Sequence, residues 1–410
     1  MKRIIIDTQS NRLFQGIAAE QNYDQRGGLC QVGEGNVVVT TNPINVDYLD
    51  YWQEVGFSLP HLLTVGPFDP SCTISDLIVR NLDVQTEIKR LIDGSNARLE
   101  FFCIEESERK LVETLGIEPY CNIDVSIKLS RKHNFKSLCE EIGLPTPEWL
   151  VGRDRRDLAK YGKKFLSDYS QPFLVKSVDG TGGISCGGMA LVRNQEELLH
   201  LCSNSATLGN HFILEKLIPD KDVELSIHWQ ITKDYELMVT DIFCQLSDNF
   251  AYAGACGPVD IAPSIKDEII LTLKDIFAPA LIKAGAIGFF CCDLIVDKSG
   301  KVFWIDFNPR KGAIIYIHSM VSRLSQNVFD NKRLHFFHRH CQADKNLSFS
   351  EVYQKIGHLM TPSEDPFVVI TNPGLIEYGY VDITGISHNS VDEAREFFVQ
   401  AEQTIKNTAC

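Results

Sequence analysis

The part of this chain that most limits its fold is residues 288–312. Two apolar runs, residues 287–296 and 301–307, flank a short polar stretch at residues 297–300, which reads Asp-Lys-Ser-Gly. Apolar runs separated by such a turn predict a β-hairpin. This region must therefore belong to a sheet, and any polar side chain within the two runs needs a reason to be there.

Acidic and amide side chains do occur within this hairpin. If Asp297 pairs with Gly300, then Asp293 and Asp306 lie on one face as diagonal neighbours, and Asn308 shares that face because side chains alternate along a strand. Diagonal neighbours are about 7–8 Å apart, close enough for two carboxylates to reach one cation. Three oxygen donors of this kind predict a Mg²⁺ site, in which Mn²⁺ could substitute. The alternative is a group of solvent-facing acids at a sheet edge.

Short apolar runs rich in β-branched residues recur near the N-terminus. Residues 84–93 have a helical pattern, and the predicted strands are residues 4–6, 37–41, 62–65 and 99–104. Strands that alternate with helices are typical of a parallel α/β domain, here over residues 1–125. The remainder also mixes both element types, with strands predicted at residues 173–177, 189–192, 211–217 and 378–383 and helices at 194–202 and 391–405.

One amphipathic helix is predicted over residues 126–143. Its apolar residues recur at steps of three and four, and Gly143 followed by Pro145 ends it. Lys132 and Lys136 are four residues apart and so lie on one side of this helix. They are candidate anion contacts, and the alternative is a solvated helix face.

A glycine-rich segment follows a strand that ends in Lys176. Five glycines occur within residues 180–188, which frees the backbone to approach a ligand and to cradle phosphate oxygens with its N–H groups. Neither the P-loop spacing nor the dinucleotide spacing is present. The candidate contacts are Gly182, Gly183 and Ser185. The alternative is a flexible hairpin tip.

Charge and composition argue against several classes of function. A formal net charge of −14 argues against a general nucleic-acid binder, since a phosphate backbone would be repelled. The 13 cysteines are scattered without zinc spacing, which predicts reduced thiols. The N-terminus lacks the features of a signal peptide, and no stretch is long enough to cross a membrane. A soluble cytoplasmic protein is therefore expected.

The order and spacing of these features resemble the ATP-grasp ligases over about residues 126–315. The resemblance implies that the chain binds ATP with Mg²⁺. The metal ligands that it implies are Asp293, Asp306 and Asn308. The phosphate contacts that it implies are Lys132, Lys176, Gly182, Gly183 and Ser185.

The resemblance also assigns contacts to the adenosine. Residues 213–218 look like the hinge of that family. Glu215 would face the adenine amino group, and the backbone of Lys216 and Leu217 would read the ring edge. Glu224 matches the acid that holds the ribose.

Arg310 and Lys176 are the catalytic residues that the resemblance implies. Arg310 matches an arginine that steadies the transferring phosphoryl group in many members. Two positions depart from the family pattern. Asp306 stands where many members have glutamate, and Cys291 stands where some have arginine, so charge stabilisation would fall more heavily on Arg310.

Within the family, the likeness is greatest to amide-forming ligases of natural-product pathways. These include the pheganomycin-type peptide ligases and the butirosin-type ligase that loads an amino acid onto a carrier protein. They have an arginine before an N-terminal strand, as Arg26 precedes residues 35–40, and a small C-terminal domain like residues 374–405. The expected fold is α/β (α+β), with an N-terminal pre-ATP-grasp domain (1–125), a small lobe with the lid (126–212), a large lobe with the Mg²⁺ site (213–333) and a C-terminal domain (334–410).

The implied reaction uses ATP to convert a small-molecule carboxylate to an acyl phosphate, which an amine then attacks to form an amide. One alternative acceptor is the thiol of an acidic carrier protein, for which the basic run at residues 332–340 is a candidate docking patch. The plainer interpretation of that run is a solvated helix end, and no acid completes a metal site with its histidines. Another alternative is a non-catalytic ATP-binding regulatory protein. A homodimer is a further expectation.

Overall fold

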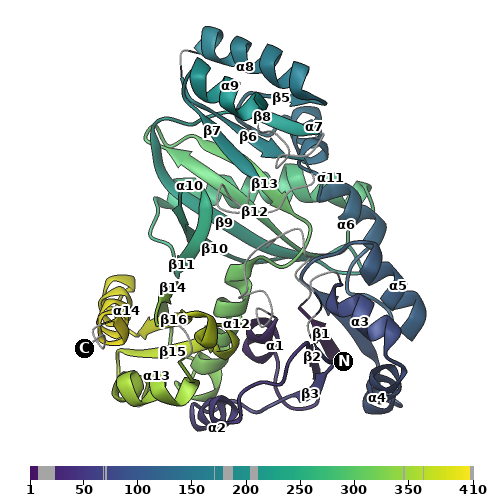
Figure 1. The fold of residues 1–410 in the computed structure, drawn as a ribbon, viewed down its shortest axis with the longest axis vertical. Helices are drawn as coiled ribbons and strands as arrows, with labels where there is room; N and C mark the ends of the chain where they lie inside the picture. The colour runs from purple at the N-terminus through teal and green to yellow at the C-terminus, as the bar shows by residue number, and fades with distance from the viewer. Residues whose placement is uncertain are drawn as a thin grey trace.

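The structure is a computed structural model in which three sheets and their helices form one connected molecule (Figure 1). It describes residues 1–7, 24–67, 69, 72–169, 171–178, 188–203, 211–344, 347–362 and 364–406. Among the helices of these residues, none combines the length and the apolar character that crossing a membrane requires. The cysteines within these ranges are free thiols, and most are buried.

The N-terminal part contains a parallel sheet in the order β3-β2-β1-β4. Its strands are β1 (Lys2–Ile6), β2 (Val37–Thr40), β3 (His61–Thr64) and β4 (Ala97–Phe101). Its helices are α1 (Gln25–Gln31), α2 (Val46–Glu54), α3 (Ile74–Arg80), α4 (Leu82–Ile92) and α5 (Glu106–Leu115). The predicted strands and helix are confirmed. The carboxyl ends of parallel strands share one edge, which is where open α/β sheets bind ligands.

The helix predicted over residues 126–143 is wrong in one respect, because the structure has two helices there. These are α6 (Ile123–Leu129) and α7 (Lys132–Ile142). The chain turns at Arg131, whose backbone is extended, and the side chain of Asn134 donates a hydrogen bond to the carbonyl of Lys128 across the break. Apolar periodicity does not register a break of this length, since Leu129 before it and Phe135 after it are buried in one hydrophobic cluster. Gly143 ends α7 at φ 74°, as predicted.

The small lobe is an antiparallel sheet in the order β5-β8-β6-β7. Its elements are β5 (Trp149–Gly152), α8 (Arg155–Tyr169), β6 (Phe173–Ser177), β7 (Met189–Val192), α9 (Gln195–Ser203) and β8 (Phe212–Lys216). Helices α8 and α9 cover one face, at the top of Figure 1, and pack on Phe173, Val175 and Leu214. Because side chains alternate, Lys176 and Glu215 lie on the opposite face.

The largest sheet is antiparallel and has eight strands in the order β13-β12-β9-β10-β11-β14-β16-β15. The strands are β9 (Lys221–Ile231), β10 (Leu237–Asp248), β11 (Ala251–Gly257), β12 (Gly288–Asp297), β13 (Val302–Asn308), β14 (His335–Gln342), β15 (Phe367–Asn372) and β16 (Tyr380–Ser387). The sheet therefore continues from the predicted large lobe into the predicted C-terminal domain, and the domain limits stay a prediction.

Helices pack against both ends of this sheet. They are α10 (Pro263–Thr272), the π-helical η4 (Leu273–Phe277), α11 (Ala278–Lys283), α12 (Ala313–Asn327), α13 (Phe349–Ile356), the 3₁₀ segments η5 (Gly357–Leu359) and η6 (Pro373–Tyr378), and α14 (Val391–Lys406). In Figure 1, α12 lies between the N-terminal sheet and the C-terminal strands. Helix α12 also contacts α1, so the segment after the hairpin connects the large sheet to the N-terminal domain.

The predicted hairpin is confirmed as β12 and β13, but its register was wrong. Asp293 lies directly opposite Asp306 instead of diagonal to it. The turn is longer than assumed, because Val296 pairs with Val302, and a bulge beside Asp293 inserts one further residue into β13. Together these irregularities bring the two carboxylates face to face.

The basic run at residues 332–340 is largely a strand and not a solvated helix end. Residues from His335 onward form β14, which pairs with β11 on one side and β16 on the other. His338 is buried, with Nδ1 2.9 Å from Oγ1 of Thr384. Lys332 and Arg333, before the strand, are exposed, whereas Arg339 and His340 within it are half-buried. The candidate docking patch is therefore smaller than the sequence indicates.

Candidate functional site

The opposed acids of the hairpin form the centre of the candidate site. Asp293 and Asp306 face each other across β12 and β13, and Asn308 follows on the same face of β13. The ammonium of Lys132, the first residue of α7, forms an ion pair with Asp306, and these side chains are 14% and 23% exposed. The break between α6 and α7 thus places Lys132 directly against the hairpin.

The two carboxylates differ in their electrostatics. Burial raises the pKa of Asp293 to about 7, and the negative charge of Asp306 adds to this effect. Burial also acts on Asp306, but the positive charges of Lys132 and Lys176 outweigh it and hold its pKa below the ordinary value. Two facing carboxylates repel each other unless a cation lies between or beside them.

This donor set fits a hard divalent cation. Two carboxylates and the amide oxygen of Asn308 are the oxygen ligands that Mg²⁺ prefers, and the repulsion between Asp293 and Asp306 is what a bound cation would relieve. Among the described residues, no three His, Cys, Asp or Glu side chains gather as a metal-ligand group. The set therefore depends on Asn308 and on oxygens from outside the protein.

Asp293 is supported from β9 by two residues that the sequence analysis missed. The hydroxyl of Ser226 donates to Oδ1 of Asp293 at 3.3 Å, and Nε2 of His228 lies 3.1 Å from the same hydroxyl. Burial lowers the pKa of His228 to about 3, so its ring is neutral and can donate to Ser226. Alternating polar residues at positions 224, 226 and 228 are the sequence signal that could have revealed this polar face of β9.

The small lobe contributes two lysines that share one buried carboxylate. Glu215 contacts Lys136 at 2.6 Å and also pairs with Lys176. Burial opposes both charges, but mutual attraction outweighs it, so the pKa of Lys176 is raised and that of Glu215 is lowered. Asp306 and Asp293 contribute to the raised pKa of Lys176. The lysines of the small lobe and the acids of the hairpin therefore act on one another.

The structure separates the two lysines of α7. The alternative of a solvated helix face is wrong for Lys136, whose side chain is only 2% exposed and contacts Glu215. Glu215 serves as the counter-ion of two lysines, and its contact with adenine stays a prediction. The backbone N–H of Lys216 donates to the carbonyl of Glu148. Leu217 follows the end of β8.

Glu224 lies on the same face of β9 as Ser226, two residues away. Its carboxylate pairs with Lys221 and accepts a hydrogen bond from Ser247 on β10. Glu224 therefore lies on the sheet face that carries the hairpin acids. Its pairing partner in the neighbouring strand β12 is Ile295. The contact of Glu224 with ribose stays a prediction.

Arg310 connects the hairpin to the N-terminal domain. One guanidinium nitrogen donates to Oδ1 of Asn308 at 2.9 Å and the other to the carbonyl of Lys311 at 2.8 Å. The guanidinium also lies over the ring of Phe102, 4.4 Å from its centroid. The remaining candidates, Gly182, Gly183 and Ser185, lie outside the described residues, as does the side chain of Arg26.

Part of the chain matches a known protein family. Residues 138–328 match the family model described as the C-terminus of D-Ala–D-Ala ligase. That range includes α7 from its second turn, the small lobe and the whole β12–β13 hairpin. No curated protein matches the chain.

Solved structures match over nearly the full chain at low identity. An N5-carboxyaminoimidazole ribonucleotide synthetase from Thermus thermophilus is 14% identical, with a TM-score of 0.60, over 99% of each chain. An ADP complex of purK, the same type of synthetase, is 12% identical, with a TM-score of 0.60, over 97% of this chain and 95% of that one. Biotin carboxylase from Campylobacter jejuni is 13% identical, with a TM-score of 0.63, over 98% and 90%. The expected ATP-grasp fold is confirmed.

Proposed function

We propose that this chain, an ADP-forming enzyme of the ATP-grasp superfamily, activates a carboxylate as an acyl phosphate and joins it to an amine. Enzymes of this superfamily use ATP with Mg²⁺. The observation that carries the proposal is the pair of opposed carboxylates, Asp293 and Asp306, set among lysines from two other elements, Lys132 and Lys176. Opposed acids and converging lysines are the groups that a metal-bound triphosphate needs.

Three lysines are proposed to hold the phosphates. Lys132 pairs with Asp306, and Lys136 and Lys176 pair with Glu215. Their ammonium groups are already turned toward the site, so phosphate oxygens can take the place of part of the carboxylate contacts. Little rearrangement is then needed when the nucleotide binds, which is the advantage of a preorganised electrostatic site.

Asp293, Asp306 and Asn308 would hold Mg²⁺, or Mn²⁺ in its place. The ion supplies charge neutralisation for the phosphate oxygens when it is bound. Ser226 orients Asp293 by donating its hydroxyl proton to one oxygen, which leaves the other oxygen for the metal. Arg310 holds Asn308 by a hydrogen bond to the oxygen that would serve as ligand.

The proposed chemistry has two steps. A carboxylate oxygen of the substrate bonds to the γ-phosphorus while the bond to the β,γ-bridging oxygen breaks and ADP leaves. The amine nitrogen then bonds to the acyl carbon, phosphate leaves, and the amine loses a proton. Arg310 and Lys176 would stabilise the negative charge on the transferring group, since phosphoryl transfer is catalysed mainly by positioning and electrostatics. The glycine-rich segment is proposed as the lid that keeps water from the acyl phosphate.

The substrates are proposed from likeness and from the N-terminal domain. Amino acids or peptide-like acids would be joined in a natural-product pathway, as in the pheganomycin-type and butirosin-type ligases. A carrier-protein thiol is the alternative acceptor, with Lys332 and Arg333 as the most exposed residues of the basic run. Bicarbonate belongs among the acids to be tested, because the synthetases and the carboxylase of similar fold are named for carboxylations.

Hydroxylamine trapping tests this proposal. The purified chain would be incubated with ATP, Mg²⁺, hydroxylamine and a panel of acids, and hydroxamate and ADP would be measured. We expect one acid class to give both products in equal amounts. Asp293→Asn should abolish them, whereas Asp297→Asn, which changes an acid in the turn of the same hairpin, should not. Formation of AMP instead of ADP would exclude the acyl phosphate.

A further inference from the structure

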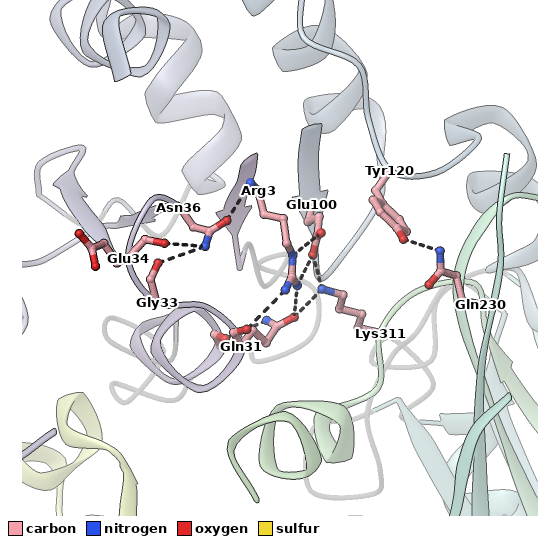
Figure 2. Close-up of polar contacts among 10 residues, drawn as sticks. Arg3, Gln31, Gly33, Glu34, Asn36, Glu100, Tyr120, Gln230 and Lys311 are labelled. Atoms are coloured by element: carbon pink, nitrogen blue, oxygen red, sulfur yellow. Dashed lines mark hydrogen bonds and ion pairs between the residues drawn. The ribbon is translucent and has the colours of Figure 1, made fainter. Parts of the chain in front are cut away.

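A second cluster of buried charges lies where the N-terminal domain meets the end of the hairpin. Figure 2 shows Arg3, Gln31 and Glu100 of the N-terminal domain converging on Lys311, which follows β13. Arg3 donates to the two oxygens of Glu100 at 2.6 and 2.8 Å. Lys311 contacts Glu100 and Gln31, and the side chains of Lys311 and Glu100 are only 4% and 2% exposed.

This cluster is held in one arrangement by its charges. Burial raises the pKa of Glu100, but Lys311 and Arg3 outweigh it and lower the pKa to about 2. A buried carboxylate between two cations has few alternative partners, so moving Lys311 would leave a charge without compensation. The ammonium of Lys311 also lies 4.4 Å from the ring centroid of Phe289 on β12. Lys311 is therefore held both by Glu100 of the N-terminal domain and by Phe289 of the hairpin.

The end of β4 holds both Lys311 and the residue before it, Arg310. Glu100 lies in β4, and Phe102 follows directly after the last residue of that strand. Lys311 pairs with Glu100, while the guanidinium of Arg310 lies over Phe102 and donates to Asn308. Two adjacent residues of the segment after β13 are thus anchored at neighbouring points, one in β4 and one just after its end.

We propose that Lys311 is a positioning residue for Arg310, and that its ion pair with Glu100 lets the N-terminal domain set where Arg310 meets the γ-phosphoryl group. This inference rests on the proposed function. Its consequence is that Lys311 affects the binding of a nucleotide with a γ-phosphate and not the binding of ADP. A displacement of about 1 Å at such a group is enough for an effect of up to about a hundredfold on turnover.

The test compares two nucleotides in the full chain by titration calorimetry with Mg²⁺. The ligands are ADP and a non-hydrolysable ATP analogue with a β,γ-imido bridge. Lys311→Met should bind ADP like the wild type but lose about tenfold in affinity for the analogue, a loss in line with weakening one hydrogen bond to a charged group. Lys311→Arg should recover most of it. Tyr120→Phe is the matched control, since it removes a hydrogen bond from Gln230 across the same interface while keeping the ring that stacks on Phe289.

Each outcome decides the question. Equal ratios of analogue to ADP affinity in Lys311→Met and wild type would overturn the proposal, and so would an equal loss for both nucleotides, which would indicate only a structural role. If Lys311→Met does not fold, Phe102→Leu gives the decision, because it removes the ring beneath Arg310 without changing any charge and should show the same selective loss. If the wild type binds neither nucleotide, the proposed function itself is refuted. If the wild type binds both, the variants test only the role of Lys311.

Discussion

Glu215 offers a sharp test of how the small lobe is built. It is 2% exposed and contacts the ammonium groups of Lys136 and Lys176. Glutamine keeps its shape but removes its charge, and so leaves two buried ammonium groups without a counter-ion. Removing one partner of a buried ion pair typically destabilises a protein by about 3–5 kcal/mol.

The size of this effect has an upper limit set by lysine chemistry. One of the two ammonium groups can lose its proton, which at pH 7.4 costs about 4 kcal/mol for a lysine with a pKa near 10.4, at 1.36 kcal/mol per pH unit. We therefore expect Glu215→Gln to lose about 3–4 kcal/mol at pH 7.4. In the wild type, the charge of Glu215 stabilises the fold at pH values above the pKa that glutamate has in the unfolded chain. This stabilisation is lost as the pH falls through the lowered pKa of Glu215 in the folded chain.

The assay is thermal unfolding with and without Mg²⁺ and ADP. Glu215→Gln should melt about 4 °C lower, since the unfolding entropy scales with chain length. The nucleotide should raise its midpoint more than that of the wild type, because phosphate then neutralises the lysines. Lys136→Met is the control, since it leaves the pair between Glu215 and Lys176 intact and should melt closer to the wild type. An unchanged midpoint in Glu215→Gln, or equal stabilisation of both proteins by ADP, would refute the counter-ion role.

Three further changes test the parts around this site. Ser226→Ala should weaken Mn²⁺ binding about tenfold, since Asp293 loses its hydrogen-bond donor, and leave metal-free ADP binding unchanged in calorimetry. Gly312→Ala would place a Cβ 2.6 Å from Cε1 of His228, and should lower stability by about 1–3 kcal/mol in thermal unfolding. Burial lowers the pKa of Lys311 to about 8, with Glu100 opposing that effect. ADP formation should therefore fall as the pH rises through 8, because the ion pair is lost, and Lys311→Arg should remove the fall in a pH–rate profile.

Local patterns were enough to predict the elements that carry the site. The hairpin and its acids follow from two apolar runs around a turn, and the parallel sheet follows from short β-branched runs between helices. Gly143 predicted the end of α7 because only a residue free of steric penalty suits φ 74°. In each case every element is predicted from its own short segment of sequence, where alternation and turn chemistry act directly.

Other features depended on contacts that a local pattern does not contain. The bulge that brings Asp293 opposite Asp306 adds one residue without altering the apolar pattern of β13. The burial of Lys136 depends on Glu215, which is far away in sequence and on another element. The basic run became β14 because strands β11 and β16 were available on both sides of it. Partners of this kind are chosen by tertiary structure, which overrides local propensity.

A common arrangement explains why the site can be both stable and reactive. Every described cation proposed to meet phosphate is held by an acid or amide of the site: Lys132 by Asp306, Lys136 and Lys176 by Glu215, and Arg310 by Asn308. Because these groups are ordered and partly desolvated when the chain folds, a metal-bound triphosphate meets them in place and exchanges one set of charge contacts for another. Such an exchange contributes modestly to affinity, since contacts are lost as well as gained. It favours the transition state more, because the negative charge that develops there is matched by cations that no longer need to move.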